Sequence, residues 1–78
     1  MKILLIDDDQ EFTSFLKMEL EDMGHPTDTA DNGIVGENMA LMTPYDLIIL
    51  DLMLPGKDGY SVCKNIRKSH IGIPVLMT

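Results

Sequence analysis

The sequence is poor in cysteine and histidine, with one cysteine, Cys63, and two histidines, His25 and His70. A single cysteine cannot form a disulfide within the chain, and this usage fits the reducing cytoplasm. The histidines lie far apart without a cysteine pair near either, which excludes a zinc cluster and predicts solvated or capping roles for both. A chain of 78 residues without these supports must gain its stability from its core or from a partner.

Basic residues are also few, 6 against 13 acidic ones, and the net charge is −7. Such a balance argues against direct contact with nucleic acid or an anionic membrane, and favours a basic partner surface. The apolar run at residues 3–6 stops at three aspartates, so it is too short for a signal peptide or a membrane span. We therefore expect a cytoplasmic domain, and the hydrophobic content of 45% predicts a packed core.

Short apolar runs alternate with amphipathic segments along the chain. The pattern predicts strands at residues 2–6, 25–30, 46–52 and 73–78, and helices at residues 11–23, 34–42 and 60–68. The second strand is weak and polar, which is typical of an edge strand. The alternation of strands with helices predicts an α/β fold with a doubly wound parallel sheet and right-handed crossovers.

The first predicted helix carries an apolar stripe, which we expect to face the core. One of the three aspartates before it is a natural N-cap, and Gly24 is a natural stop. Asp9 is expected to be only a cap or a solvated residue. The stripe consists of Phe12, Phe15, Leu16, Leu20 and Met23.

Acidic residues follow two of the predicted strands. Asp7, Asp8 and Asp9 come directly after the first strand, and Asp51 lies at the end of the third. Ligands of parallel sheets gather at the carboxyl ends of the strands, so we expect these acids to meet in one crevice. Clustered carboxylates favour Mg²⁺, Mn²⁺ or Ca²⁺ over zinc, and a carboxylate beside such an ion can act as a nucleophile toward phosphorus. The alternative is that these aspartates are helix caps and solubilising charges.

Four segments of the chain resemble the receiver domains of two-component response regulators. They are residues 3–8 (ILLIDD), 30–33 (ADNG), 45–59 (YDLIILDLMLPGKDG) and 73–77 (IPVLM). The third segment is the most specific, since it sets an aspartate, a Met-Leu-Pro-Gly loop and an Asp-Gly pair at the spacing of the family. The resemblance extends over the whole chain and implies a flavodoxin-like fold.

The resemblance also implies a function. Asp51 would be the phosphoacceptor, Asp7 and Asp8 the acidic pair around Mg²⁺ (or Mn²⁺), and Met53 would add its backbone carbonyl to the ion. In the family, a sensor histidine kinase donates the phosphoryl group, and the receiver catalyses only its own phosphorylation and dephosphorylation. The chain is thus expected to be a signalling module rather than an enzyme, with any contact to DNA made by a separate output domain.

The family continues after its fourth strand with a serine or threonine, two more helices and a fifth strand that carries a lysine. Residues 1–78 are therefore expected to form a single incomplete receiver domain, in which Thr78 precedes the position of the hydroxyl residue. The last strand would then be an exposed edge. An exposed edge predicts a homodimer, including one formed by segment exchange.

Three other interpretations of the sequence compete with this one. A flavodoxin-type flavin protein needs phosphate-binding donors after its first strand, where this chain has three aspartates. An aspartyl-phosphate phosphohydrolase would have an Asp-x-Asp pattern at its nucleophile. Here Asp51 is followed by Leu52 and Met53, so the second acid is absent. A third interpretation, a non-signalling fragment that acts as a dimerisation or interaction piece, stays open.

Two further side chains are given structural roles. Lys57 is interpreted as a solvated loop lysine, in preference to a group that steers a phosphodonor. Cys63 is interpreted as a buried inert thiol.

Overall fold

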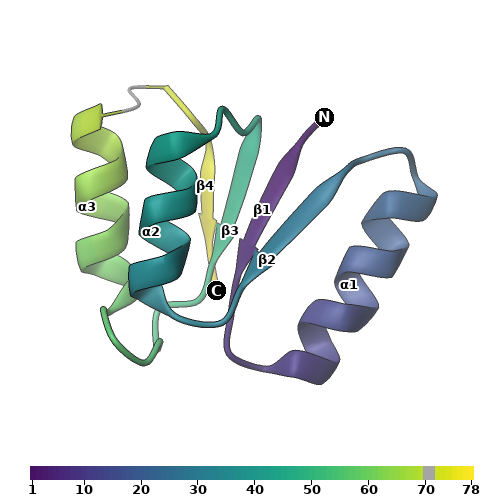
Figure 1. The fold of residues 1–78 in the computed structure, drawn as a ribbon, viewed down its shortest axis with the longest axis horizontal. Helices are drawn as coiled ribbons and strands as arrows, with labels where there is room; N and C mark the ends of the chain where they lie inside the picture. Colours follow the sequence, from purple (N-terminus) through teal and green to yellow (C-terminus); the bar gives the residue numbers. More distant parts are fainter. Residues whose placement is uncertain (70–71) are drawn as a thin grey trace.

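The computed structural model describes residues 1–69 and 72–78, so the prediction for His70 lies outside the described residues. Each predicted strand and helix is present, and its ends differ from the predicted ones by at most two residues (Figure 1). The elements are β1 (Ile3–Ile6), α1 (Gln10–Asp22), β2 (Thr27–Ala30), α2 (Gly33–Met42), β3 (Leu47–Leu50), α3 (Gly59–Ser69) and β4 (Val75–Met77). None of the described helices is long and apolar enough to cross a bilayer.

The described strands form one sheet in the order β2-β1-β3-β4, and every neighbouring pair is parallel. Ile6 pairs with Ala30 on one side and with Leu50 on the other. The central strand β1 thus ends level with both of its neighbours. This arrangement confirms the predicted parallel α/β sheet and places the polar strand β2 and the last strand β4 at its two edges.

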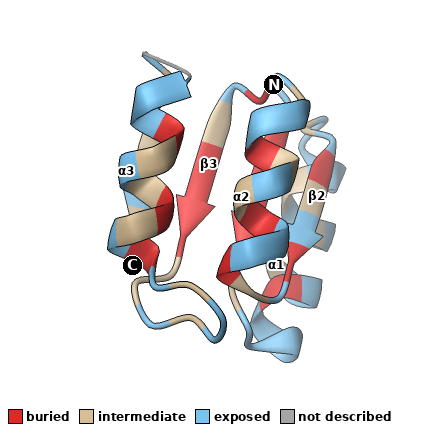
Figure 2. Cartoon of the chain, turned by 60° about the vertical axis from the view of Figure 1, so that its left-hand side comes forward, coloured by how far each residue is buried: buried red, intermediate tan, exposed pale blue. Residues whose placement is uncertain are grey.

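Helix α1 covers one face of the sheet, whereas α2 and α3 cover the other (Figure 1). Strands β1 and β3 are apolar at every position because both of their faces are covered. Alternate residues along these strands belong to two hydrophobic clusters, one on each face of the sheet. Figure 2 shows the buried positions of α2 and α3 turned toward the sheet. The α2–α3 side holds Leu4, Ile6, Ile48, Leu50, Ala40, Val62 and Ile66, and the α1 side holds Ile3, Leu5 and Ile49 against Leu16 and Leu20.

The prediction for the apolar stripe of α1 is partly wrong. Leu16 and Leu20 pack on the sheet, but Phe12, Phe15 and Met23 are exposed, and Thr13 is buried instead. The helix lies mainly against the edge strand β2, so its contact line passes through positions 13, 16 and 20 rather than through the centre of the stripe. The described residues consequently leave apolar side chains in contact with water on this side of the molecule.

The predicted helix boundaries rest on side-chain caps. The Asp9 carboxylate accepts a hydrogen bond from the backbone N–H of Phe12 (3.1 Å), which confirms its capping role. Gly24 follows α1 with a φ of 88°, a left-handed conformation that glycine adopts readily. At the start of α2, the side chain of Asn32 accepts a hydrogen bond from the N–H of Val35 (2.9 Å).

The sequence predicts a solvated or capping role for His25. This side chain is not simply solvated, because its Nδ1 lies 3.0 Å from the N-terminal amine of Met1.

A buried tyrosine links the edge strand β2 to the segment before β3. The Tyr45 hydroxyl donates to a carboxylate oxygen of Asp28 at 2.6 Å, and burial together with this neighbour raises the pKa of Tyr45 to about 12. Because the folded pKa is raised, the bond contributes stability below about pH 10, and that contribution is lost as the pH rises toward 12.

We expect Tyr45→Phe to lower the free energy of unfolding by about 1 kcal/mol at neutral pH, because it removes one part-buried hydrogen bond. Urea unfolding at neutral pH and between pH 10 and pH 12 measures this difference. The difference between wild type and variant should shrink across that alkaline range. A constant difference would contradict the assigned role of the hydroxyl.

Candidate functional site

The candidate site lies where the carboxyl ends of β1 and β3 meet. Backbone hydrogen bonds continue past the strands, since the N–H of Asp51 donates to the carbonyl of Ile6 (2.9 Å) and the N–H of Asp7 donates to that of Ala30 (3.0 Å). These bonds fix the first acid after each strand at the same edge of the sheet. The parallel pairing of β1 with β3 is therefore what brings Asp7 beside Asp51.

Asp7, Asp8 and Asp51 form a group in which one carboxylate oxygen of each lies within 4.8 Å of the others. Asp7 and Asp51 are half-buried, and Asp8 is exposed. Within residues 1–69 and 72–78, this is the one group of three acidic, histidine or cysteine side chains so placed. Asp9 does not belong to it. The predicted meeting of strand-end acids is thus present in the structure.

Backbone donors orient two of these carboxylates. One oxygen of Asp7 accepts from the N–H of Asp9 (2.9 Å), and one oxygen of Asp51 accepts from the N–H of Met53 (3.1 Å). Burial raises the pKa of Asp7 above its usual value, and the charges of Asp51, Asp8 and Asp9 raise it further, while the bond from Asp9 opposes them. A bound cation would relieve this repulsion. Three carboxylates without histidine or thiolate suit Mg²⁺ or Mn²⁺.

The loop from Leu52 to Asp58 forms the rim of the site. Gly59 is required where the loop meets α3, because a Cβ there would lie 2.5 Å from the carbonyl oxygen of Asp51. Asp58 precedes α3, and its carboxylate accepts hydrogen bonds from the backbone N–H of Ser61 (3.0 Å) and from the Ser61 hydroxyl (2.9 Å). These bonds lower the pKa of Asp58. Met53 is 84% exposed, and it contacts the site through the backbone N–H that donates to Asp51.

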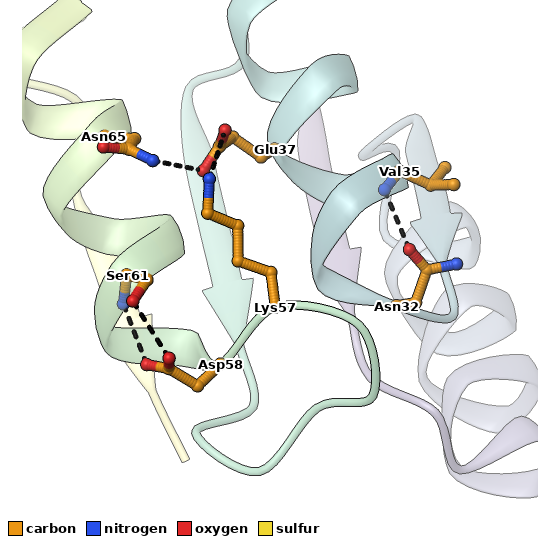
Figure 3. A network of polar contacts seen from close by, with 7 residues as sticks. All are labelled: Asn32, Val35, Glu37, Lys57, Asp58, Ser61 and Asn65. Carbon is orange, nitrogen blue, oxygen red and sulfur yellow. Dashed lines mark hydrogen bonds and ion pairs between the residues drawn. The ribbon is translucent and has the colours of Figure 1, made fainter.

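The prediction that Lys57 is a solvated loop lysine is wrong. Its ammonium group forms an ion pair with Glu37 of α2 (3.0 Å), and the Lys57 side chain is only 33% exposed (Figure 3). Cys63 packs against the core but is only half-buried, so it is less buried than predicted. One signal in the sequence could have indicated a partner for Lys57. Glu37 is the only charged residue among residues 33–42.

Comparison with known proteins defines the class of this chain. Residues 3–78 match the response regulator receiver domain family. Among curated proteins, the probable transcriptional regulatory protein SilR of Salmonella typhimurium is 40% identical over 77 residues, a match that covers 99% of this chain and 34% of SilR.

Solved structures agree with this match. The receiver domain of the Pseudomonas aeruginosa PAO1 sensor histidine kinase PA1611, which has a magnesium ion coordinated in its active-site cleft, aligns with a TM-score of 0.91 at 29% identity. A complex of the histidine kinase ThkA with the response regulator TrrA contains a match with a TM-score of 0.89 at 36% identity. Each alignment covers 97% of this chain, and 64% and 66% respectively of the matched chains.

The chain therefore belongs to the response regulator receiver domain family, whose members are signalling modules with a flavodoxin-like fold. It spans about a third of the length of the curated relative described above.

Proposed function

We propose that the chain is the phosphoacceptor module of a two-component signalling protein and that Asp51 receives the phosphoryl group. The observation that carries the proposal is the convergence of three carboxylates at the ends of β1 and β3, in a chain of the receiver family. Asp8, Asp51 and the Met53 carbonyl would hold Mg²⁺, with Asp7 contributing mostly through water. The ion would neutralise charge on the transferred oxygens.

The residues of the chain account for the transfer. A carboxylate oxygen of Asp51 attacks phosphorus and forms a P–O bond as the P–N bond of a phosphohistidine breaks, and the leaving imidazole nitrogen takes up a proton. Water later hydrolyses the acyl phosphate, which restores the carboxylate and releases inorganic phosphate. The N–H of Met53, 3.1 Å from the Asp51 carboxylate, holds the oxygen that is not attacking.

A sensor histidine kinase is the proposed donor, and the kinase–regulator complex in the comparisons supports this choice. Asp8 is exposed and Asp7 and Asp51 are half-buried, so a large protein donor can reach the acids. The name of SilR supports a role in transcription, with DNA bound by an output domain rather than by this chain of net charge −7. A cytoplasmic location belongs to the same proposal, as does the expectation that the chain is not an enzyme and catalyses only its own phosphorylation and dephosphorylation.

Magnesium-linked stability tests the metal part of the proposal. We expect Mg²⁺ at ten times its Kd to raise the free energy of unfolding by about 1.4 kcal/mol, because it binds only the folded chain. Asp8→Asn should remove this gain and should stabilise the metal-free protein, since it deletes one of three crowded negative charges. Urea unfolding with EDTA or Mg²⁺ measures both effects. Asp22→Asn, at the end of α1 and away from the site, is the matched control.

The exposed strand β4 carries a separate prediction about assembly. In the described residues β4 pairs only with β3, and Leu76 on it is 56% exposed. Unpaired strand edges with apolar side chains favour pairing with another chain. We therefore expect the 78-residue chain to elute larger than a monomer, and Leu76→Lys to shift it toward a monomer. Light scattering that finds a monodisperse monomer of the wild type would contradict the prediction.

A further inference from the structure

We propose that Glu37 is a positioning residue that holds the loop of residues 52–58, through Lys57 and Asn65, in the conformation that binds the cation. The inference rests on the proposed function, because it concerns the same metal site. Glu37 itself lies on α2 and is not one of the three clustered acids. It would act only through the loop that carries Met53.

Glu37 connects three separate elements with one carboxylate (Figure 3). Its Oε2 lies 3.0 Å from the ammonium of Lys57 in the loop, and its Oε1 accepts from the side-chain amide of Asn65 in α3 at 2.9 Å. Both oxygens of the carboxylate are thus engaged. The Glu37 side chain is only 14% exposed, so water competes weakly for these bonds. A charge-assisted contact of this kind is stronger than a solvated surface ion pair.

The same helix holds the loop at a second point. One turn before Glu37, the backbone N–H of Gly33 donates to the carbonyl of Pro55 (3.1 Å). A Cβ at Gly33 would lie 1.9 Å from the carbonyl oxygen of Lys57. The backbone of α2 and the backbone of the loop are therefore in direct contact at this position. Gly33 and Glu37 lie on the same face of α2 and contact neighbouring parts of the loop.

These contacts restrict the segment that contains Met53. On one side, the N–H of Leu52 donates to the carbonyl of Thr78 (3.2 Å) and its carbonyl accepts from Gly59 (3.0 Å). On the other side, Leu54 packs against the core and Pro55 is bound to α2. Met53 therefore lies between two fixed points. If Lys57 loses its ion pair with Glu37, the loop on the Pro55 side becomes more mobile. The Met53 carbonyl is then positioned less firmly toward the acids.

Manganese affinity of the metal-free protein tests this role, with Mn²⁺ alone as the probe and electron paramagnetic resonance as the readout. Residues that orient metal ligands typically change affinity by about tenfold or more, so we expect Glu37→Gln and Lys57→Met each to weaken Mn²⁺ binding on the order of tenfold. Lys64→Met removes the same charge as Lys57→Met from an exposed position on α3 and should bind like the wild type.

A charge-exchanged variant, Glu37→Lys with Lys57→Glu, separates positioning from a general loss of stability. The pair can reform, and the Asn65 amide can turn its oxygen toward a lysine at position 37. We expect this double variant to recover most of the affinity lost by Lys57→Met. Urea unfolding of each variant gives its folded fraction, so that affinity refers to folded protein only.

The outcomes distinguish the inference from the function on which it rests. Wild-type affinity in folded Glu37→Gln would overturn the positioning role alone. Mn²⁺ binding that survives Asp8→Asn and Asp51→Asn, or its absence from the wild type, would overturn the proposed metal site and the positioning role with it. Loss in the two single variants with recovery in the exchanged pair would support the inference.

Discussion

Replacing Asp51 with asparagine is expected to abolish Mg²⁺-dependent labelling by acetyl phosphate or phosphoramidate, because the amide lacks the nucleophilic carboxylate oxygen. Intact mass measurement should find one phosphoryl adduct on the wild type and none on the variant. The fold should be retained, since asparagine can still accept the hydrogen bond from the N–H of Met53. Circular dichroism on the same samples checks this.

The matched control for this experiment is Asp22→Asn, which removes one acid from the end of α1 and should leave labelling unchanged. An adduct that persists on Asp51→Asn would assign the phosphoryl group to another residue. A folded wild-type chain that accepts no adduct would instead favour the interaction-piece interpretation, in which the acids serve no transfer chemistry in this chain.

The second large effect is expected at Gly33, where α2 meets the loop. Alanine at this position would place its Cβ 1.9 Å from the carbonyl oxygen of Lys57, a backbone atom that cannot rotate away. Overpacking of this kind costs about 3 kcal/mol, and the better helix propensity of alanine returns only about 1 kcal/mol. We expect Gly33→Ala to lower the free energy of unfolding by roughly 2 kcal/mol, a large part of the stability of a small domain.

Urea unfolding of Gly33→Ala measures this loss. The control is Asn38→Ala, an exposed position on the same helix, which should change stability little. Equal unfolding midpoints for the two variants would show that the loop can move away from α2 at low cost. That result would also weaken the argument that α2 fixes the loop.

The site could be predicted from the sequence to the extent that strand ends define it. Buried parallel strands produce uninterrupted apolar runs, so the ends of β1 and β3 are marked by the first aspartates after them. The residues alone therefore sufficed to place Asp7 and Asp51 together. The segment of residues 45–59 specified the family as well, through the spacing of its acids, glycines and proline.

The contacts between elements could not be predicted in this way. Helical periodicity identified the stripe of α1, but the position of the helix over β2 decided that Thr13 is buried and Phe15 is exposed. Likewise, Lys57 lies in a loop, and its partner Glu37 lies 20 residues earlier on α2. Their meeting depends on how α2 packs against the loop, which local sequence patterns do not encode.

The central position of β1 has a consequence for how the chain acquires its fold during synthesis. Ile6 is synthesised before its partner Leu50 in β3, which lies 44 residues later in the chain. At roughly 5–20 residues per second, the ribosome needs about 2 to 9 s to produce that partner. During this interval the apolar segment of residues 3–6 has no complete sheet to enter. Until β3 has emerged, the apolar side chains of residues 3–6 therefore lack one of the two strands that flank them in the folded sheet.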